Sequence, residues 1–196
     1  MTERVDGRKL RFQHRYGEVL DAATEHALDH GLDDLSLRKV AQSAGVSHAT
    51  LVHHFESKDR LVAEIVQRVL ADILTVPDLP PGDPDPLRVI WRRATAEGGR
   101  RYVRLFLAIT GQAMYGDPAL AKTIAASMRR RTDLIAAGLV RHGYPEPQAQ
   151  IAATSLLACM RGLFADLLTT GDTERVDAAF EDTVSELEQR IADRAS

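Results

Sequence analysis

The segment LSLRKVAQSAGVSHATLVHHFESK, residues 35–58, places small and helix-capping residues at positions with strict geometric requirements. Ser36 suits the start of a short helix, because its hydroxyl oxygen can accept hydrogen bonds from free backbone N–H groups. Ala41 is small enough for two helices to cross closely, and Gly45 can adopt the positive φ of a tight turn. A second helix then begins near Ser47. This spacing predicts a helix-turn-helix.

The rest of the chain has the pattern of consecutive helices. Apolar residues recur every three or four positions from about residue 9 to residue 30, and again after Lys58. Residues 75–86, TVPDLPPGDPDP, are rich in proline and cannot continue a helix, so we expect a domain boundary there. Further helices are expected at about residues 85–98, 100–115, 117–142, 145–170 and 173–194.

No segment alternates polar and apolar residues for long, so the prediction is an all-α protein of about nine helices. Residues 9–72 are expected to form an N-terminal three-helix DNA-binding domain, with the helix-turn-helix at about 36–55. Residues 85–196 are expected to form a C-terminal helical domain, for which the family resemblance given below implies ligand binding and dimerisation.

Composition narrows the class of protein. Hydrophobic residues make up 44% and charged residues 27%, as in ordinary globular proteins, and the net charge is −3. The single cysteine, Cys159, cannot form an internal disulfide, and no uninterrupted apolar run has membrane-spanning length. We therefore expect a cytoplasmic protein without a membrane partner. No Walker loop, Gly-rich dinucleotide turn or Glu-x-x-His pair is present, so neither an enzyme nor a cofactor is expected.

Residues around the helix-turn-helix carry a family pattern. Its elements are Val40-Ala41, Ala44-Gly45-Val46-Ser47, Thr50-Leu51, His54-Phe55 and Lys58 with Leu61. The pattern resembles the DNA-binding domain of the TetR (tetracycline-repressor) family over roughly residues 9–72. The resemblance implies a dimeric transcriptional regulator, usually a repressor, which binds a palindromic operator and is released by a small molecule. Val52 departs from the family, which has a phosphate-contacting tyrosine there.

Two groups of residues are candidates for DNA contact. A recognition helix presents its N-terminal side chains to base edges, which singles out Ser47, His48, Ala49 and Thr50. Phosphate contacts are expected from Ser36, Arg38 and Lys58 at helix starts, where free backbone N–H groups add to the side chain. A further phosphate contact is expected from His53.

The histidines of this segment do not have the spacing of a metal site. His53 and His54 are adjacent, so on a helix their side chains point about 100° apart. His48 and His53 are five positions apart, which is no better, and no cysteine lies nearby. No metal is therefore expected, and the family pattern turns His54 inward as a structural residue.

The C-terminal region supplies candidates for dimerisation and ligand binding. Residues 153–168, ATSLLACMRGLFADLL, are apolar nearly all round, and the last helix has an apolar stripe. Two such helices from each subunit predict a four-helix dimer interface that uses Leu156, Gly162, Leu163, Phe180, Val184 and Leu187. The family implies a cavity for a small apolar or planar inducer, and the large side chains expected to line it are Trp91, Phe106, Tyr115, Met160 and Phe164.

Two alternatives to a ligand-responsive repressor stay open. A regulator of the same architecture can act without a small molecule, through a protein partner or as an activator. A helical-bundle enzyme is the other alternative, although no catalytic motif supports it.

Overall fold

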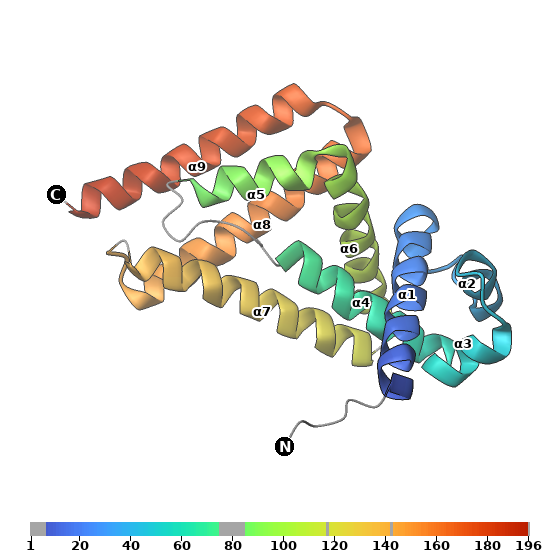
Figure 1. The fold of residues 1–196 in the computed structure, drawn as a ribbon. Helices are drawn as coiled ribbons and strands as arrows, with labels where there is room; N and C mark the ends of the chain where they lie inside the picture. The colour runs from blue at the N-terminus through green and yellow to red at the C-terminus, as the bar shows by residue number, and fades with distance from the viewer. Residues whose placement is uncertain (1–6, 75–84, 117, 142, 196) are drawn as a thin grey trace, which may run out of the picture. The chain divides into compact units, whose positions relative to one another are not determined.

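The structure of the chain is a computed structural model that describes residues 7–74, 85–116, 118–141 and 143–195, except the side chains of residues 7–13, 70–74, 119, 194 and 195. The described residues form nine helices and no strand (Figure 1). The predicted all-α fold of about nine helices is therefore confirmed. The helices are α1 (Gly7–His30), α2 (Leu37–Ser43), α3 (His48–Phe55), α4 (Lys58–Leu74), α5 (Pro86–Thr95), α6 (Glu97–Tyr115), α7 (Pro118–Arg141), α8 (Glu146–Thr170) and α9 (Thr173–Ala195).

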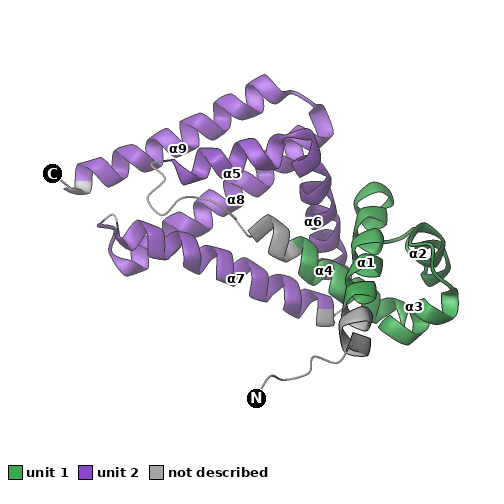
Figure 2. Cartoon of the chain, in the orientation of Figure 1, with its two compact units in different colours: residues 1–73 green, residues 74–196 purple. Residues whose placement is uncertain are grey.

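The chain divides into two compact units, residues 1–73 and residues 74–196 (Figure 2). In the first unit, each of the four helices buries one face in a common core. The core side chains have at most 4% of their surface exposed, and they include Val19, Ala23 and Ala27 of α1, Val40 and Ala41 of α2, Leu51 and Phe55 of α3, and Leu61, Ile65 and Val69 of α4.

The turn between α2 and α3 has the geometry that the sequence predicts. Gly45 has φ +62, in the left-handed region that glycine adopts without steric strain. The backbone N–H of Val46 donates to the carbonyl of Ala41 at 2.9 Å, and that of Gly45 donates to Gln42 at 3.3 Å. These bonds close the end of α2 and turn the chain into α3.

The core of the second unit is organised around an aromatic stack. The Trp91 ring of α5 lies between Phe180 of α9, at 4.3 Å between ring centroids and 6° between planes, and Phe164 of α8, at 4.9 Å and 10°. The indole Nε1 donates to Oδ1 of Asp177 at 2.7 Å. The helix α5 thus lies against both α8 and α9 (Figure 1). The indole N–H of its tryptophan has a hydrogen-bond acceptor, and the ring packs between two aromatic side chains.

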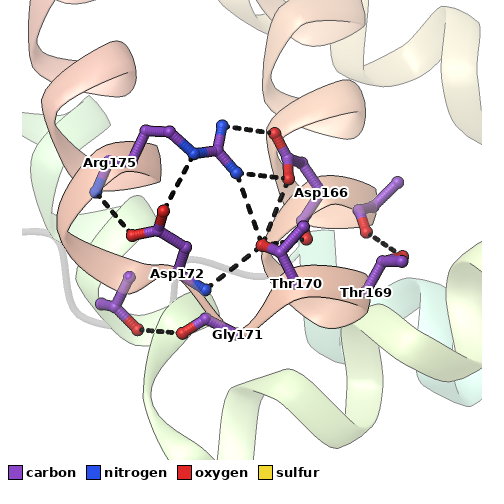
Figure 3. Close-up of polar contacts among 8 residues, drawn as sticks. Asp166, Thr169, Thr170, Gly171, Asp172 and Arg175 are labelled. Atoms are coloured by element: carbon purple, nitrogen blue, oxygen red, sulfur yellow. Dashed lines mark hydrogen bonds and ion pairs between the residues drawn. The ribbon is translucent and has the colours of Figure 1, made fainter.

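Ion pairs hold α9 in this position. The Arg88 guanidinium of α5 donates from Nε to Glu181 at 2.7 Å and from Nη1 to Glu188 at 2.8 Å, both on α9. At the turn before α9, the two terminal nitrogens of Arg175 donate to Asp166 of α8 at 2.8 and 2.7 Å, and its Nε donates to Asp172 (Figure 3). Planar, two-pronged arginine–carboxylate contacts of this kind fix direction as well as distance.

The boundary between α5 and α6 differs from the prediction. A break was expected at Gly98-Gly99, but α5 ends at Thr95, and both glycines lie in the first turn of α6. The physical reason is close backbone packing. A Cβ atom on Gly99 would lie 2.0 Å from the carbonyl oxygen of Arg93, so only glycine fits at this corner.

Among the described residues, α8 alone meets a length-and-composition test for a membrane-crossing helix. Core helices of globular proteins meet the same test. Leu156, Met160 and Leu167 of α8 are buried in the core cluster that contains Trp91 and Phe180. Packing within the helical unit therefore accounts for part of the apolar character of α8.

The left-handed turn at Gly45 yields a stability prediction. Replacing Gly45 by Ala should lower the free energy of unfolding by about 1–2 kcal/mol, because a side chain disfavours positive φ, although space for the methyl group is open. Gly17→Ala is the control, since Gly17 lies inside α1 with equally open space, and it should stabilise the chain by about 0.5–1 kcal/mol. Urea unfolding followed by circular dichroism measures both changes. Equal effects of the two substitutions would contradict the strained-turn account.

Candidate DNA-binding surface

The start of α2 is a capped helix end. The Ser36 hydroxyl oxygen accepts a hydrogen bond from the backbone N–H of Lys39 at 3.2 Å, and Ser36 has extended backbone geometry (φ −138, ψ 148). Arg38, in the first turn, is exposed. The neighbouring Lys39 is instead ion-paired with Asp34, and this contact holds the pKa of the Asp34 carboxyl below its usual range. Of the two cations, Arg38 is therefore the one available for an external anion.

The start of α3 is capped in the same way. The Ser47 hydroxyl oxygen accepts from the backbone N–H of Thr50 at 3.0 Å, and the hydroxyl groups of Ser47 and Thr50 lie 2.8 Å apart. Such a cap contributes about 1 kcal/mol to helix stability. Ser47 and Thr50, both expected to contact bases, are thus also engaged with each other.

The two faces of α3 differ sharply. Leu51 and Phe55 are fully buried, whereas His48, Ala49 and His53 are exposed. Val52, where the family pattern has a tyrosine, is 37% exposed. This short helix is therefore anchored by one face and presents the other to solvent, as a recognition helix requires.

His54 belongs to the anchored side, as the family pattern predicts. It is half-buried, and its ring meets the Tyr16 ring of α1 edge-on at 6.0 Å, while the Phe55 ring stacks on Tyr16 at 4.9 Å. Burial, followed by the charges of His53 and Arg15, lowers the pKa of the His54 imidazole from its usual value of 6.5. The neutral imidazole is therefore the form that fits the fold.

The start of α4 contributes the last expected phosphate contact. Ser57 accepts from the backbone N–H of Arg60 at 3.2 Å and caps the helix, and Lys58, its first residue, is exposed. Glu56, between α3 and α4, has φ +61, an uncommon conformation for a residue other than glycine. This turn places the beginning of α4 directly after the end of α3.

The first unit thus contains all eight residues expected to contact DNA. Six are exposed, namely Arg38, Ser47, His48, Ala49, His53 and Lys58, and two are half-buried, namely Ser36 and Thr50. Both half-buried residues take part in helix caps. Within the described ranges, no group of three or more His, Cys, Asp or Glu side chains is arranged to hold a metal ion.

Two family models match this architecture in order along the chain. The model described as "Bacterial regulatory proteins, tetR family" matches residues 19–65, and "Tetracyclin repressor-like, C-terminal domain" matches residues 88–190. The second match alone covers more than half of the 196 residues. The chain belongs to the TetR family of transcriptional regulators. TetR proteins are regulators rather than enzymes, and they bind DNA operators, often dimerise and often bind small molecules.

Curated TetR relatives match over a short part of the chain. The chain is 37% identical over 59 residues to the HTH-type transcriptional repressor KstR2 of Rhodococcus jostii, which is 30% of this chain and 29% of that protein. It is 33% identical over 69 residues to the HTH-type transcriptional activator FasR of Mycolicibacterium smegmatis, which is 35% of this chain and 32% of that protein. The match thus spans about a third or less of either relative.

Solved TetR-like structures match nearly the whole fold. A transcriptional regulator from Rhodococcus sp. Rha1 has a TM-score of 0.75 at 24% identity and covers 89% of this chain and 96% of that one. The multidrug binding protein EbrR, complexed with proflavin, has a TM-score of 0.62 at 23% identity and covers 87% and 98% of the two chains. At these identities the likeness concerns the fold alone.

The structure does not bring the five expected ligand-lining residues together. Trp91, Phe164 and Met160 belong to the packed cluster that also contains Phe180 of α9. Phe106 lies on α6 beneath the Arg131 guanidinium, and Tyr115, at the end of α6, is 93% exposed. Tyr115 thus lies outside the packed core, and a ligand-lining role for the other four residues stays a prediction.

The six expected dimer-interface residues fall into two groups. Leu156, Phe180, Val184 and Leu187 are at most 6% exposed within the protomer itself, so their side chains are covered before any partner binds. Gly162 is exposed and Leu163 is half-buried. The apolar stripe of α9 thus faces its own core, where Trp91 stacks on Phe180.

The sequence interpretation missed a pair of arginines in the second unit, Arg131 on α7 and Arg161 on α8. Burial lowers the pKa of both guanidinium groups. A signal was present in the sequence, because Arg131 follows Ile124 and Ser127 at helical spacing and both of these are buried. A charged residue at the helical spacing of a buried face is the signal by which Arg131 could have been found.

The lowered pKa of His54 predicts a pH dependence of stability. The unfolded chain binds a proton near the usual value of 6.5, whereas the folded chain does so only at lower pH, so folding is weakened as pH falls through that value. Unfolding midpoints in urea should therefore decline more steeply between pH 7.5 and 5.5 for the natural chain than for His54→Gln. His48→Gln, at an exposed position of the same helix, is the control, because His48 is not among the groups that lower the pKa of His54. Parallel pH profiles for the natural chain and His54→Gln would refute this role.

Proposed function

We propose that this TetR regulator is a cytoplasmic, dimeric repressor that binds a palindromic operator through α3 and is released by a small molecule. The observation that carries the proposal is the two-faced α3. Leu51 and Phe55 are buried in the core on one face, while His48, Ala49 and His53 are exposed on the other. An α-helix of this kind fits the major groove, where base edges are distinguishable.

Base reading is assigned to the start of α3. The imidazole of His48 can donate to guanine or to a phosphate, and the Ala49 methyl group suits contact with a thymine methyl. Ser47 and Thr50 bond to each other, so they present fixed hydroxyl groups rather than mobile ones. Ser36, Arg38, His53 and Lys58 position the helix by contacts with phosphates, which carry no sequence information.

The exposed face of α8 supports the dimer. Of its most apolar 18-residue window, only 22% is buried within the protomer, although the segment is apolar enough to pass for a membrane helix. The exposed positions include Ile151, Ala158, Gly162 and Ala165, and a Cβ on Gly162 would meet nothing within 4 Å. Small residues let two helices approach closely, so the proposed interface is this face of α8 crossing its copy.

A groove beside this face favours the same assignment. It has a volume of about 390 Å³ and lies between α8 and α9, with Ile151, Ser155 and Cys159 on one side and Thr183 and Arg190 on the other. A side chain from a second α8 or α9 would fill such a groove. The interface then combines the outer face of α8 with the polar side of α9, while the inner faces keep the protomer core.

We propose repression rather than activation because the stronger of the two curated matches is to a repressor. KstR2 is a repressor and FasR an activator, and the match to KstR2 has the higher identity, 37% over 59 residues against 33% over 69. The likeness to EbrR, whose structure contains proflavin, supports a small-molecule effector. Action without a ligand is the alternative, and a chain that binds operator identically with every small molecule tested would favour it.

The division into base and phosphate contacts predicts two kinds of variant. Lys58→Ala should weaken binding to all DNA sequences alike and reduce the slope of log affinity against log salt by about one. His48→Ala should instead change preference at one position of each half-site by about 1–3 kcal/mol. Selection from a random duplex library followed by salt titration separates the two effects.

Lys122→Ala is the control for Lys58→Ala, because Lys122 is an exposed lysine on α7 in the other unit. It should leave both sequence preference and salt slope unchanged. A selection profile for His48→Ala identical to that of the natural chain would show that α3 does not read bases through this residue.

The proposed interface predicts a loss of dimerisation without a loss of folding. Ala158→Glu introduces a carboxylate on the exposed face of α8 and should cost several kcal/mol of association free energy, because the charge becomes buried without a partner. Sedimentation should show monomers with an unchanged helix content. Ala126→Glu, at an exposed position of α7, is the control and should stay dimeric. A substitution at Phe180, an expected interface residue, would not test the interface, because Phe180 is part of the protomer core.

A further inference from the structure

The buried face of α7 carries an arginine whose charge nothing in the described part of the chain neutralises. Arg129, Arg130 and Arg131 are consecutive, and the first two are exposed. Arg131 turns inward, and its Nε and Nη2 atoms are buried without a hydrogen-bond partner. The hydroxyl of Ser127, one turn earlier on the same face, is also buried without a partner.

The surroundings of Arg131 are apolar on one side and positive on the other. Its guanidinium carbon lies 4.7 Å from the centre of the Phe106 ring of α6. Burial, and then the charge of Arg161 on α8, lowers the pKa of Arg131 to about 10. The group therefore keeps its proton at neutral pH, so two cations from different helices face one interior region.

A buried guanidinium without a hydrogen-bond partner, close to a second, half-buried cation, is unfavourable in a folded chain. The cation–π contact with Phe106 offsets only part of the lost hydration. Structural arginines inside proteins are normally paired with a carboxylate, as Arg88 is with Glu181 and Glu188 in this same unit. The arrangement at Arg131 is instead complementary to an anion that is not part of the described chain.

We propose that Arg131 and Arg161, with the Ser127 hydroxyl, bind the anionic group of an organic effector whose apolar body lies along Phe106. This inference rests on the proposed ligand response. It specifies the effector as an apolar or aromatic acid rather than a neutral or cationic compound. The aromatic ring beneath the guanidinium selects an anion that carries an apolar body, and the two arginines select its charge. Binding joins α7 to α8 through the shared anion.

The test uses two dyes that differ by one charged group. The first is 8-anilinonaphthalene-1-sulfonate, and the second is N-phenyl-1-naphthylamine, the same framework without the sulfonate. Fluorescence titration of the full chain should show tighter binding of the sulfonate. Arg131→Met should weaken sulfonate binding about tenfold or more, as expected for loss of a charge-assisted hydrogen bond, and should leave the neutral dye bound at least as tightly.

Arg130→Met is the matched control, because it removes the neighbouring exposed arginine of the same helix and should change neither affinity. Arg161→Met is the second variant and should also weaken the sulfonate selectively. Circular dichroism checks that each variant is folded. Equal loss of both dyes in the two variants would show that the arginines act only through the local packing and not on the charge of the ligand, and the proposal would be wrong.

Two further results would also overturn the proposal. Displacement of the sulfonate dye by inorganic phosphate as effectively as by decanoate, at equal ionic strength, would mean that the apolar body is not recognised. Conversion of Arg131→Met into a monomer would assign the arginine to a carboxylate of the partner subunit. Decanoate displacing the dye in the natural chain but not in Arg131→Met supports the proposal.

Failure of the anion-site proposal can be distinguished from failure of the proposed function. Dye binding is measured on the protein without DNA, so it reports the anion site whether or not the chain represses. A second titration, with selected operator DNA present, reports release. Arginine-dependent dye binding without DNA release would leave the anion site standing and refute the ligand-released repressor.

Discussion

The recognition helix depends on the burial of Leu51 and Phe55. The helix α3 has eight residues, and isolated helices shorter than about 12–15 residues are marginal in water. Its helicity therefore comes from packing, in which each fully buried side chain contributes about 1.5–3 kcal/mol, and from the Ser47 cap. Because the outer face contributes little to this balance, His48, Ala49 and His53 can vary with the DNA sequence to be read without unfolding the domain.

In the C-terminal unit, too, packing within the protomer holds the helices in place. Trp91 stacks on Phe164 and on Phe180 at once, so the apolar stripe of α9 is covered by α5 within the same protomer. The ion pairs of Arg88 and Arg175 hold α9 against the rest of the unit. The surface that we propose for a partner is the outer face of α8, where the small residues Ala158, Gly162 and Ala165 are exposed.

Two partly buried arginines of this unit, Arg88 and Arg131, have different surroundings. Arg88, which is partly buried, meets carboxylates at 2.7 and 2.8 Å, and these hydrogen bonds raise its pKa. Arg131 meets an aromatic ring and another cation, and its pKa falls. The first arrangement stabilises the fold. The second lowers stability in the free protein, which is the signature of a group kept for binding rather than for folding.

Sequence alone determined the features that depend on neighbours within four or five positions. The helix order, the left-handed turn at Gly45 and the capping role of Ser36 all rest on such local contacts, and the family pattern rests on the same segment. Tertiary structure decided which surfaces meet. It turned Phe180 toward Trp91, 89 positions away by their residue numbers, rather than toward a partner, and it brought Arg131 beside Arg161. Helical periodicity reveals that a face is buried, but not which surface, from the same chain or from another molecule, covers it.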